Sequence, residues 1–296
     1  MQPQLGTQIS RRLPYLIPVW LGISLLAFSI AGLAPGDPAA MILQQRTGEQ
    51  PTLEAIQELR DEMGLDDSFP ARYSRWLGDA IRGDLGTSYR SGASVFRELA
   101  ARFPSTIQLA IGALLLGVAI SLPLGVVAAV RYGSPIDHLS RLLSLLGTAI
   151  PSFVLGYLLI LFFSVTLGVL PVAGSAGWRN LVLPVLTLAL GEAATLVRLT
   201  RANMLEVLGE DYVRTARAKG LPPWLVVTRH ALRNALNPMV TLTGVRAGRL
   251  LGGAVIVETI FAREGVGKLL VDSIQARDYP MIQGFVLFSG TVFLLT

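Results

Sequence analysis

Six long stretches of apolar sequence constrain the fold of this chain more than any other feature. The first, Leu13–Gly36, contains no charged residue and exceeds the roughly 20 residues that a helix needs to cross a bilayer. Only 15% of all residues are charged, against roughly 25% in soluble domains. The sequence therefore predicts an all-α integral membrane protein with six transmembrane helices. The other five runs are Phe103–Val130, Leu142–Leu170, Leu181–Val197, Met239–Ile260 and Met281–Thr296.

The placement of charge predicts how these helices are oriented. Arg11 and Arg12 precede the first run, and basic residues flank membrane spans on the cytoplasmic side, so we expect a cytoplasmic N-terminus. This run is too long for the core of a signal peptide, about 7 to 15 residues, and should stay in the membrane. The net charge of +5 is concentrated near span ends, so it indicates orientation and no nucleic-acid partner. The last run has 16 residues, short of a crossing, and we expect a truncated chain.

Three parts follow from this pattern. They are a cytoplasmic N-terminus with the first transmembrane helix (1–36), an extracytoplasmic subdomain (37–102) and a core transmembrane domain (103–296). In the subdomain, apolar residues at helical spacing predict two short amphipathic helices. The apolar face of the first helix consists of Leu53, Ile56, Leu59 and Met63, and that of the second consists of Tyr73, Trp76, Leu77 and Ile81.

Prolines in two of the runs bear on how the helices start and where they break. Pro104 stands at the start of the second run, where a helix tolerates it. Pro151 lies inside Leu142–Leu170, which at 29 residues is longer than one straight crossing, so we expect a kink, a tilt or a re-entrant stretch there. Broken backbone at membrane depth persists only against protein or water, which makes this run a candidate for lining a pathway.

Three ionisable residues fall at membrane depth, where charge is costly unless it is paired or faces water. Glu192 in the fourth run and Arg246 in the fifth lie at similar depth, roughly 12 Å from the cytoplasmic ends at 1.5 Å rise per residue. The pattern favours an ion pair between them over a substrate contact. Arg249 has no obvious partner and is the stronger candidate for lining a pathway. The chain has no cysteine, which excludes disulfides, thiolate metal sites and cysteine nucleophiles.

The most basic block of the chain lies between the fourth and fifth runs. Arg198–Pro238 holds seven Lys/Arg and three Asp/Glu, which predicts a cytoplasmic position. Its layout predicts two short helices, Glu206–Lys219 and Pro222–Leu236, with Gly220 ending the first. Such a rigid hairpin is typical of a docking surface. The alternative is a basic loop held at the anionic inner leaflet.

Two segments of this block, Asp211–Gly220 and His230–Pro238, resemble the cytoplasmic coupling loop, or EAA motif, of the membrane subunits of ABC importers. The likeness is closest to the peptide and nickel permease family. Arg214-Thr-Ala216 stands where Glu-Ala-Ala is usual, and Leu232-Arg233 stands where Leu-Pro is; both are ordinary in the peptide branch. The resemblance implies that the loop, residues 201–237, seats on an ATPase subunit through Asp211, Tyr212, Arg214, Ala216, Lys219, Gly220, Leu221, Pro222, Trp224, His230, Arg233 and Asn234.

The resemblance extends to segments expected outside the membrane. These are Pro35–Pro38, Gly64–Asp66, Gly83–Gly86, Gly265–Gly267, Leu269–Asp272 and Arg277–Pro280. Contact with a substrate-binding protein is then implied for the 37–102 subdomain, the alternative being a lid that only packs on the pore mouth. The residues implied in that contact are Asp37, Tyr73, Trp76 and Asp84. Gly265-Val-Gly-Lys268 is not a phosphate-binding loop, because Leu269 stands where Ser or Thr is needed.

A function follows from the resemblance as an expectation. The chain would be the transmembrane domain of a type I ABC importer and form half of a translocation pathway for di- or oligopeptides. Its implied partners are a second homologous permease subunit, two ATP-binding subunits that hold ATP and magnesium, an extracytoplasmic binding protein and the lipid of a bacterial inner membrane. The chain itself would bind no cofactor and catalyse no reaction.

Three alternatives remain open at this point. The same role for nickel or a metal chelate is the second candidate, although the absence of Cys and of any membrane His leaves no typical site for a bare ion. A stand-alone secondary transporter would use Glu192 as its ion site, but such folds carry internal repeats and none is seen here. A membrane-embedded enzyme is disfavoured because His138 and His230 both lie in segments expected in the cytoplasm.

Overall fold

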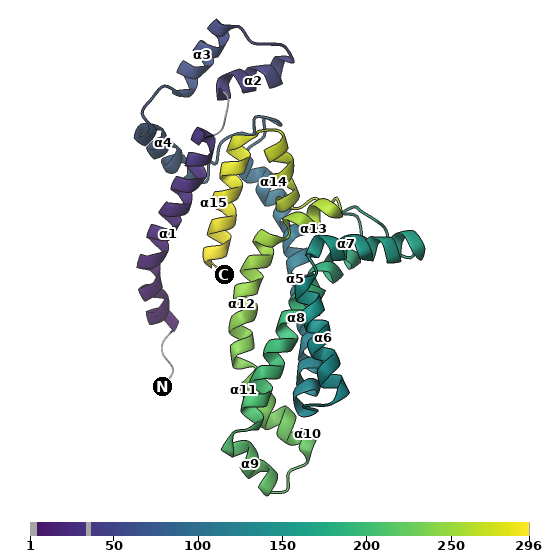
Figure 1. The fold of residues 1–296 in the computed structure, drawn as a ribbon. Helices are drawn as coiled ribbons and strands as arrows, with labels where there is room; N and C mark the ends of the chain where they lie inside the picture. The colour runs from purple at the N-terminus through teal and green to yellow at the C-terminus, as the bar shows by residue number, and fades with distance from the viewer. Residues whose placement is uncertain (1–4, 34–36, 296) are drawn as a thin grey trace. The chain divides into compact units, whose positions relative to one another are not determined.

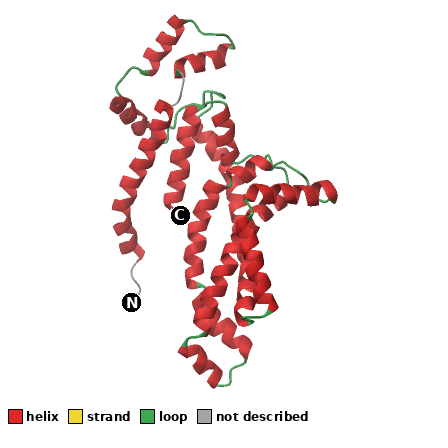
Figure 2. Ribbon diagram, viewed as in Figure 1, coloured by secondary structure: helices red, strands yellow, loops and turns green. Residues whose placement is uncertain are grey.

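The computed structural model describes residues 5–33 and 37–295, which form helices joined by loops (Figure 2). Among these residues, extended backbone pairs at one place, an antiparallel bridge between Thr87 and Ser94. Helical structure thus agrees with the all-α prediction. Pro35 and Gly36, part of the segment expected to end the first helix, lie outside the described residues.

The helices divide into two compact units. The first comprises Met1–Phe103 together with Leu269–Leu295, and the second comprises Pro104–Lys268. The division falls next to the predicted domain boundary at residue 102. Leu269–Leu295 groups with the N-terminal part of the chain in the first unit. The division into the three parts 1–36, 37–102 and 103–296 stays a prediction.

Side chains cap the starts of two helices in the first unit, α2 (Pro38–Thr47) and α3 (Leu53–Met63). Asp37 Oδ1 accepts a hydrogen bond from the backbone N–H of Ala39 at 2.9 Å, and Thr52 Oγ1 accepts one from Ala55 at 3.3 Å. Each satisfies a backbone donor that a helix start leaves unpaired. The helices of this unit are α1 (Leu5–Leu33), α2, α3, α4 (Phe69–Ile81), the start of α5 (Val95–Val130), the end of α14 (Val266–Gln275) and α15 (Tyr279–Leu295).

Helix α1 packs along α15 within this unit (Figure 1). Trp20 Nε1 donates to Thr291 Oγ1 at 2.9 Å, and Gln283 Nε2 donates to the Phe28 carbonyl at 3.1 Å. Interhelical hydrogen bonds of this kind join apolar helices that have no hydrophobic drive to associate in lipid. The last apolar run is therefore tied to the first.

The apolar face predicted for α3 is largely unburied. No residue of α3 is buried, and Leu53 is 85% exposed. Thr52 caps the helix, and Gly64 ends it in the left-handed conformation. Helix spacing thus identified the element correctly, but it could not show whether another element covers the apolar face.

The second unit holds the remaining helices. They are α5 from Pro104 onward, α6 (Pro135–Ala149), α7 (Ser152–Leu159) with a π-helical continuation η1 (Ile160–Thr166), α8 (Arg179–Leu208), α9 (Asp211–Ala218), α10 (Pro223–Leu225) with η2 (Val226–Ala231), α11 (Leu232–Ala235), α12 (Asn237–Gly253), α13 (Val255–Ile260) and the start of α14. The buried core of this unit includes Leu109, Leu183, Leu250, Val257 and Phe261. It joins α5, α8, α12 and α13.

Two helices within the described ranges, α5 and α8, are long and apolar enough to cross a membrane, and a bent pair of helices would make a third crossing if it is one span. The apolar parts Tyr15–Ile30 and Tyr279–Leu295 are shorter. The first, fifth and sixth crossings stay predictions from the sequence.

The break at Pro151 is confirmed and is sharper than a kink. Helix α6 ends at Ala149, α7 begins at Ser152, and the two directions differ by 103°. Proline lacks a backbone N–H and restricts the residue before it to extended backbone, and Ile150 has ψ 121°. The third run is therefore two helices instead of one tilted span.

Two predicted helix boundaries were wrong. Pro104 does not start a helix, because α5 begins at Val95 and carries this proline in its interior. Helix α8 does not end at Val197 but continues to Leu208, so Glu206 belongs to it and not to the following helix. At Pro104, a proline next to a change from charged to apolar sequence had indicated a helix start. At Val197, the change from apolar to charged sequence had indicated a helix end, although no helix breaker stands there.

Small residues let α8 approach its neighbours closely. A Cβ at Gly125 of α5 would lie 2.5 Å from Thr200 Cβ, and one at Gly147 of α6 would lie 2.7 Å from Ala194 Cβ. Such contacts are typical of helix packing in membranes. Helix α8 is thereby fixed against α5 and α6, and its end carries the basic block.

Candidate functional site

The two charged residues predicted to pair inside the membrane do so. Arg246 Nη1 of α12 donates to Glu192 Oε2 of α8 at 2.6 Å, and each side chain is 17% exposed. Equal depth on two neighbouring helices was sufficient to predict this contact. Arg246 Nε is buried and has no hydrogen-bond acceptor among the described residues.

Arg249 lies in the same place, one helical turn further along α12. Together with Glu192 and Arg246 it lines a cavity of about 280 Å³. The cavity is next to the break between α6 and α7, since Ile150 and Ser152 also line it. The structure thus brings all three predicted intramembrane residues together beside the interrupted backbone.

Beyond the end of α8 the basic block forms a hairpin of two helical arms, which we call the basic hairpin (residues 209–236). It lies at the end of α8 (Figure 1). One arm is α9, and the other is the continuous run of α10, η2 and α11. Gly220 stands between the arms with φ +76°, a conformation that glycine adopts without strain, and its N–H bonds to the Arg217 carbonyl at 2.9 Å. The glycine predicted to end the first helix therefore lies at the turn between the two arms.

Apolar side chains hold the basic hairpin together and to the end of α8. Val213, Ala216 and Val226 form one buried cluster, which joins the two arms. Ala231 and Ala235 form a second cluster with Met204 of α8 and Ala129 of α5. Ala216 and the half-buried Leu221 thus pack inside the hairpin, whereas the sequence had placed them in its contact surface.

The other predicted coupling residues are mostly exposed. Trp224 has 67% of its surface exposed and Tyr212 has 41%. The Asn234 amide donates to Tyr212 Oη at 2.8 Å and ties the two arms on this side. His230 is half-buried. The remaining exposed members are Asp211, Arg214, Lys219, Gly220, Pro222 and Arg233.

A buried ion pair near this end of the unit was missed by the sequence analysis. Asp137, at the start of α6, accepts two hydrogen bonds from Arg201 of α8, from Nε at 2.5 Å and Nη2 at 2.9 Å. It also accepts from the Gly133 N–H at 3.1 Å. Because Asp137 is 0% exposed, this bidentate contact fixes α6 to the root of the basic hairpin.

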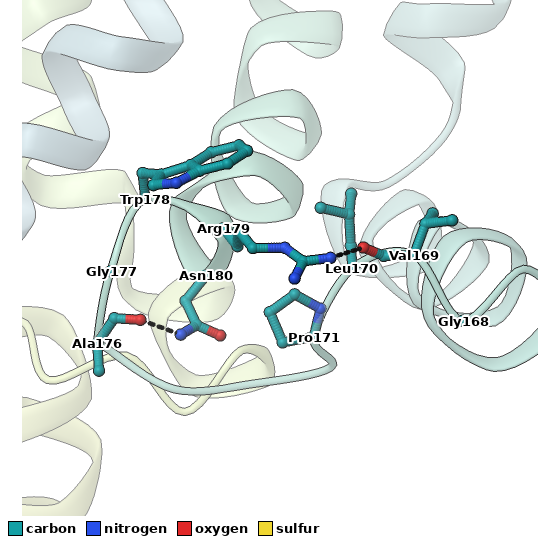
Figure 3. A pocket seen from close by; sticks show the side chains of 9 residues that line it. All are labelled: Gly168, Val169, Leu170, Pro171, Ala176, Gly177, Trp178, Arg179 and Asn180. Atoms are coloured by element: carbon teal, nitrogen blue, oxygen red, sulfur yellow. Dashed lines mark hydrogen bonds between the residues drawn. The ribbon is translucent and has the colours of Figure 1, made fainter.

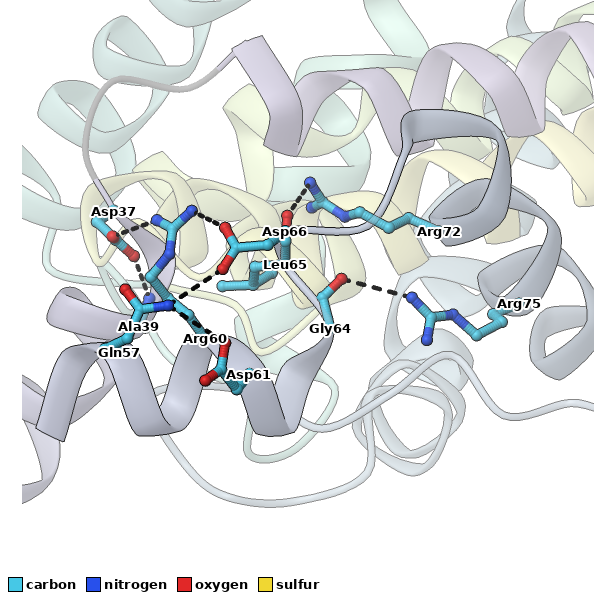
Figure 4. Close-up of polar contacts among 10 residues, drawn as sticks. All are labelled: Asp37, Ala39, Gln57, Arg60, Asp61, Gly64, Leu65, Asp66, Arg72 and Arg75. Carbon is cyan, nitrogen blue, oxygen red and sulfur yellow. Dashed lines mark hydrogen bonds and ion pairs between the residues drawn. The ribbon is translucent and has the colours of Figure 1, made fainter. Parts of the chain in front are cut away.

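The residues implied in contact with a binding protein have contacts within the first unit. Arg60 lies between Asp37, at 2.6 Å, and Asp66 (Figure 4), and its hydrogen bond lowers the pKa of Asp66. Tyr73 Oη shares a hydrogen bond with Ser24 Oγ at 2.8 Å, and its ring lies 5.6 Å from that of Phe28.

Trp76 and Asp84 complete this set. The Trp76 ring lies 5.5 Å from the Phe28 ring of α1, so it packs α4 against that helix. Asp84 is exposed and accepts a hydrogen bond from the Gly86 N–H at 2.9 Å. Of the four residues, Asp84 is the most open, and the other three have a role in holding the first unit together.

The cavity in Figure 3 is formed by the loop between η1 and α8. Its volume is about 440 Å³, and residues 168–171 and 176–180 line it. Arg179 Nη2 donates to the Val169 carbonyl at 2.6 Å, and Asn180 donates to the Ala176 carbonyl. Both hydrogen bonds are accepted by backbone carbonyl groups of the loop, so the Arg179 and Asn180 side chains hold the loop in this conformation.

Glu258 is a second buried charge that the sequence analysis passed over. Its carboxylate accepts hydrogen bonds from Thr106 Oγ1 at 2.6 Å and from the backbone N–H groups of Gly267 and Lys268 at 2.8 and 3.1 Å. It therefore caps the start of α14. The sequence signal was the pair of glycines at 265 and 267, where any side chain would meet this carboxylate.

Replacing Gly267 by alanine is expected to destabilise the second unit. The new Cβ would lie 2.6 Å from Val255 Cα, a backbone atom that cannot move aside. Overpacking of this kind costs about 1–3 kcal/mol. Gly244→Ala is the matched control, because that helical glycine has no atom within 4 Å of a new Cβ. Thermal unfolding in detergent should show a lower Tm for the first variant alone; equal Tm values would contradict this packing.

Comparison with known proteins identifies the family to which this chain belongs. The sequence profile of the binding-protein-dependent transport system inner membrane component family matches residues 121–296. The chain belongs to this family. A second profile, of the N-terminal part of such membrane components, matches residues 7–110. The chain is therefore a permease subunit of a binding-protein-dependent ABC importer and an integral protein of a bacterial inner membrane.

Similar permeases cover nearly the whole chain. The glutathione transport system permease protein GsiC of Escherichia coli O6:H1 (strain CFT073) is 41% identical over 287 residues, which span 97% of this chain and 92% of the relative. GsiC of Pectobacterium atrosepticum (strain SCRI 1043) is 43% identical over 286 residues, 96% and 92% of the two chains. The inward-facing MetNI methionine ABC transporter aligns with a TM-score of 0.54 at 21% identity, over 67% of this chain and 91% of that chain, and shows the shared fold.

Membership of this family decides between the functional classes that the sequence analysis left open. The permease is the non-catalytic transmembrane component of an ATP-driven transporter. Such a permease works with a second permease, ATPase subunits and a binding protein. The stand-alone transporter and the membrane-embedded enzyme are both excluded.

Proposed function

We propose that this permease forms half of a pathway for short peptides, glutathione among them, and that the basic hairpin passes the motion of the ATPase subunits to α8 and α12. The named function of relatives that match 96–97% of the chain supports this substrate. The role of the hairpin rests on one observation. Its apolar residues are buried against α8 and α5, while its charged and aromatic residues face outward.

The connections of the hairpin are suited to rigid-body transmission. Helix α8 runs without a break to Leu208, and only Gly209 and Glu210 separate it from α9. Leu236 joins α11 to α12 in helical conformation. The Asn203 amide donates to the Ala235 carbonyl at 3.3 Å and links the two sides. A shift of the hairpin therefore moves both helices that carry the Glu192–Arg246 pair. In this account the hairpin and the N-terminus are cytoplasmic, and ATP and magnesium bind in the ATPase subunits.

Two exposed tryptophans provide a test of the docking surface. Trp224 lies on the basic hairpin and is 67% exposed; Trp178 lies in the loop before α8 and is 74% exposed. Trp224→Ala is expected to weaken ATPase binding by on the order of 2 kcal/mol, about 30-fold in affinity, because tryptophans dominate binding surfaces. Trp178→Ala should leave it unchanged. Affinity of the purified ATPase for the permease in nanodiscs measures both, and equal affinities would contradict the proposal.

Competition for uptake tests the substrate. In cells that produce the complete importer, uptake of labelled glutathione should be inhibited by unlabelled di- and tripeptides. Inhibition by a nickel chelate, with none by peptides, would contradict the peptide assignment and favour the metal alternative.

A further inference from the structure

The cavity beside the α6–α7 break has walls that are mostly apolar or small. Four elements contribute to it: the end of α6, the start of α7, the middle of α8 and the second half of α12. Its volume of about 280 Å³ is below the usual range of about 300–1,000 Å³ for small-molecule pockets. It can hold one end of a short peptide but not a whole one. The lining residues are Gly147, Ile150, Ser152, Leu155, Thr187, Leu188, Gly191, Glu192, Arg246, Arg249 and Leu250.

The charges that line this cavity do not cancel. Glu192 and Arg246 neutralise one another at 2.6 Å. Arg249 is exposed, and no acidic side chain within residues 37–295 lies within ion-pair distance of it. Two arginines and one glutamate leave the cavity with a net charge of +1.

An unpaired guanidinium at membrane depth is costly unless it faces water or an anion. Its planar donors match the two oxygens of a carboxylate, which it binds with two parallel hydrogen bonds. Arg246 already donates a hydrogen bond to Glu192, so it is less free to bind a carboxylate. Its charge nevertheless makes the electrostatic potential beside Arg249 more positive. The cavity is therefore selective for negative charge, and a carboxylate is the anion that every peptide carries.

We propose that this cavity is a carboxylate subsite of the translocation pathway, in which Arg249 binds the terminal carboxylate of a short peptide and the Glu192–Arg246 pair fixes the adjoining wall. This proposal rests on the proposed function and deepens it. We expect the substrate to occupy this cavity, because the cavity adjoins broken backbone. At membrane depth, broken backbone is found against protein or water-filled space. An acidic residue of the second permease is the competing occupant.

The absence of cysteine from the chain allows a direct test of the cavity potential. In the complete importer, Ser152→Cys places a single thiol of this chain in the cavity wall. Its rate of labelling by an anionic and by a cationic methanethiosulfonate reagent is followed by mass spectrometry of this chain, so that cysteines of partner subunits do not interfere. The ratio of the two rates reports the local charge and cancels any change in thiol reactivity.

Arg249→Gln, added to Ser152→Cys, is expected to lower the anionic-to-cationic ratio by roughly 3- to 10-fold, as removal of a nearby unit charge does in a partly screened site. Arg249→Lys should keep the ratio, because it keeps the charge. Arg131→Gln removes the same charge from the exposed loop between α5 and α6, at the opposite end of α6 from the cavity, and should also leave the ratio unchanged. An unchanged ratio in Arg249→Gln, or an equal fall in all three variants, would overturn the proposal.

Protection by a thiol-blocked substrate tests occupancy. S-methylglutathione should slow labelling of Ser152→Cys by several-fold, and its diamide, which lacks both carboxylates, should not. If Ser152→Cys cannot be labelled in the complete importer, the second permease seals the cavity and the subsite is refuted. The labelling ratio does not depend on uptake. Failure of the proposed function would instead appear as absent ATP-driven glutathione uptake by the unmodified importer.

Discussion

Replacing Gly220 by valine is expected to lower ATP-driven uptake by about tenfold or more while the membrane-embedded helices stay folded. The residue has φ +76°, and a left-handed conformation costs a residue with a Cβ roughly 1–2 kcal/mol, the most for a β-branched one. No atom lies within 4 Å of a new Cβ, so this strain comes from the backbone and not from crowding. It acts on the angle between α9 and α10, which sets the shape of the surface that the ATPase contacts.

Gly220→Asn is the matched control for this variant. Asparagine has a side chain of similar size but tolerates the left-handed conformation, so uptake should stay close to that of the unmodified permease. Uptake into proteoliposomes and thermal unfolding are measured for both variants. Full activity of the valine variant would show that the hairpin does not transmit motion, and a collapse of Tm would show that the glycine has a global structural role instead.

Breaking the Glu192–Arg246 pair is expected to destabilise the permease by about 3 kcal/mol, because one charge is then left buried without its partner. Glu192→Gln raises the net charge of the cavity from +1 to +2, since Arg246 and Arg249 then line it without an acidic partner. Arg246→Gln leaves Glu192 unpaired beside Arg249. The double variant Glu192→Gln/Arg246→Gln removes both charges and should recover most of the stability.

The double-mutant cycle separates the pair from other effects of the substitutions. Unfolding of the four proteins in the same detergent should give a coupling energy of at least about 1 kcal/mol, as contacting charged residues do. Additive losses would mean that the 2.6 Å contact contributes nothing to stability. The double variant then reports on function: normal stability with reduced uptake would assign the pair a part in the pathway.

The sequence predicted best the features that depend on a single strong local rule. Gly220 ends α9 because glycine alone adopts its conformation freely, and Pro151 separates α6 from α7 because proline cannot continue the backbone bonds of a helix. The Glu192–Arg246 pair followed from equal depth on adjacent spans and the high cost of isolated charge in lipid.

Features that depend on distant parts of the chain could not be predicted. Asp137 and Arg201 are 64 positions apart, and Glu258 meets Thr106 across 152 positions. A charged residue near a span end looks the same in sequence whether it faces solvent or is buried. The missed burial of Asp137 and Glu258 reflects this ambiguity.

The sequence also could not show which of the predicted coupling residues are buried inside the basic hairpin and which are exposed. Arg214 and Ala216 are two positions apart and so lie on opposite faces of α9; Ala216 is buried and Arg214 is exposed. A short amphipathic helix shows which residues share a face, but not which face another element covers. In α9 the covered face became clear only from the contact of Val213 and Ala216 with Val226.

The central claim is that this permease is half of a pathway that other subunits power. It is tested most directly by reconstituting the chain in liposomes in two forms, alone and with its second permease, ATPase subunits and binding protein, and measuring uptake of labelled glutathione with and without ATP. We predict ATP-dependent uptake by the complete assembly and none by the chain alone. Uptake by the chain alone, or uptake by the assembly that does not depend on ATP, would contradict the account.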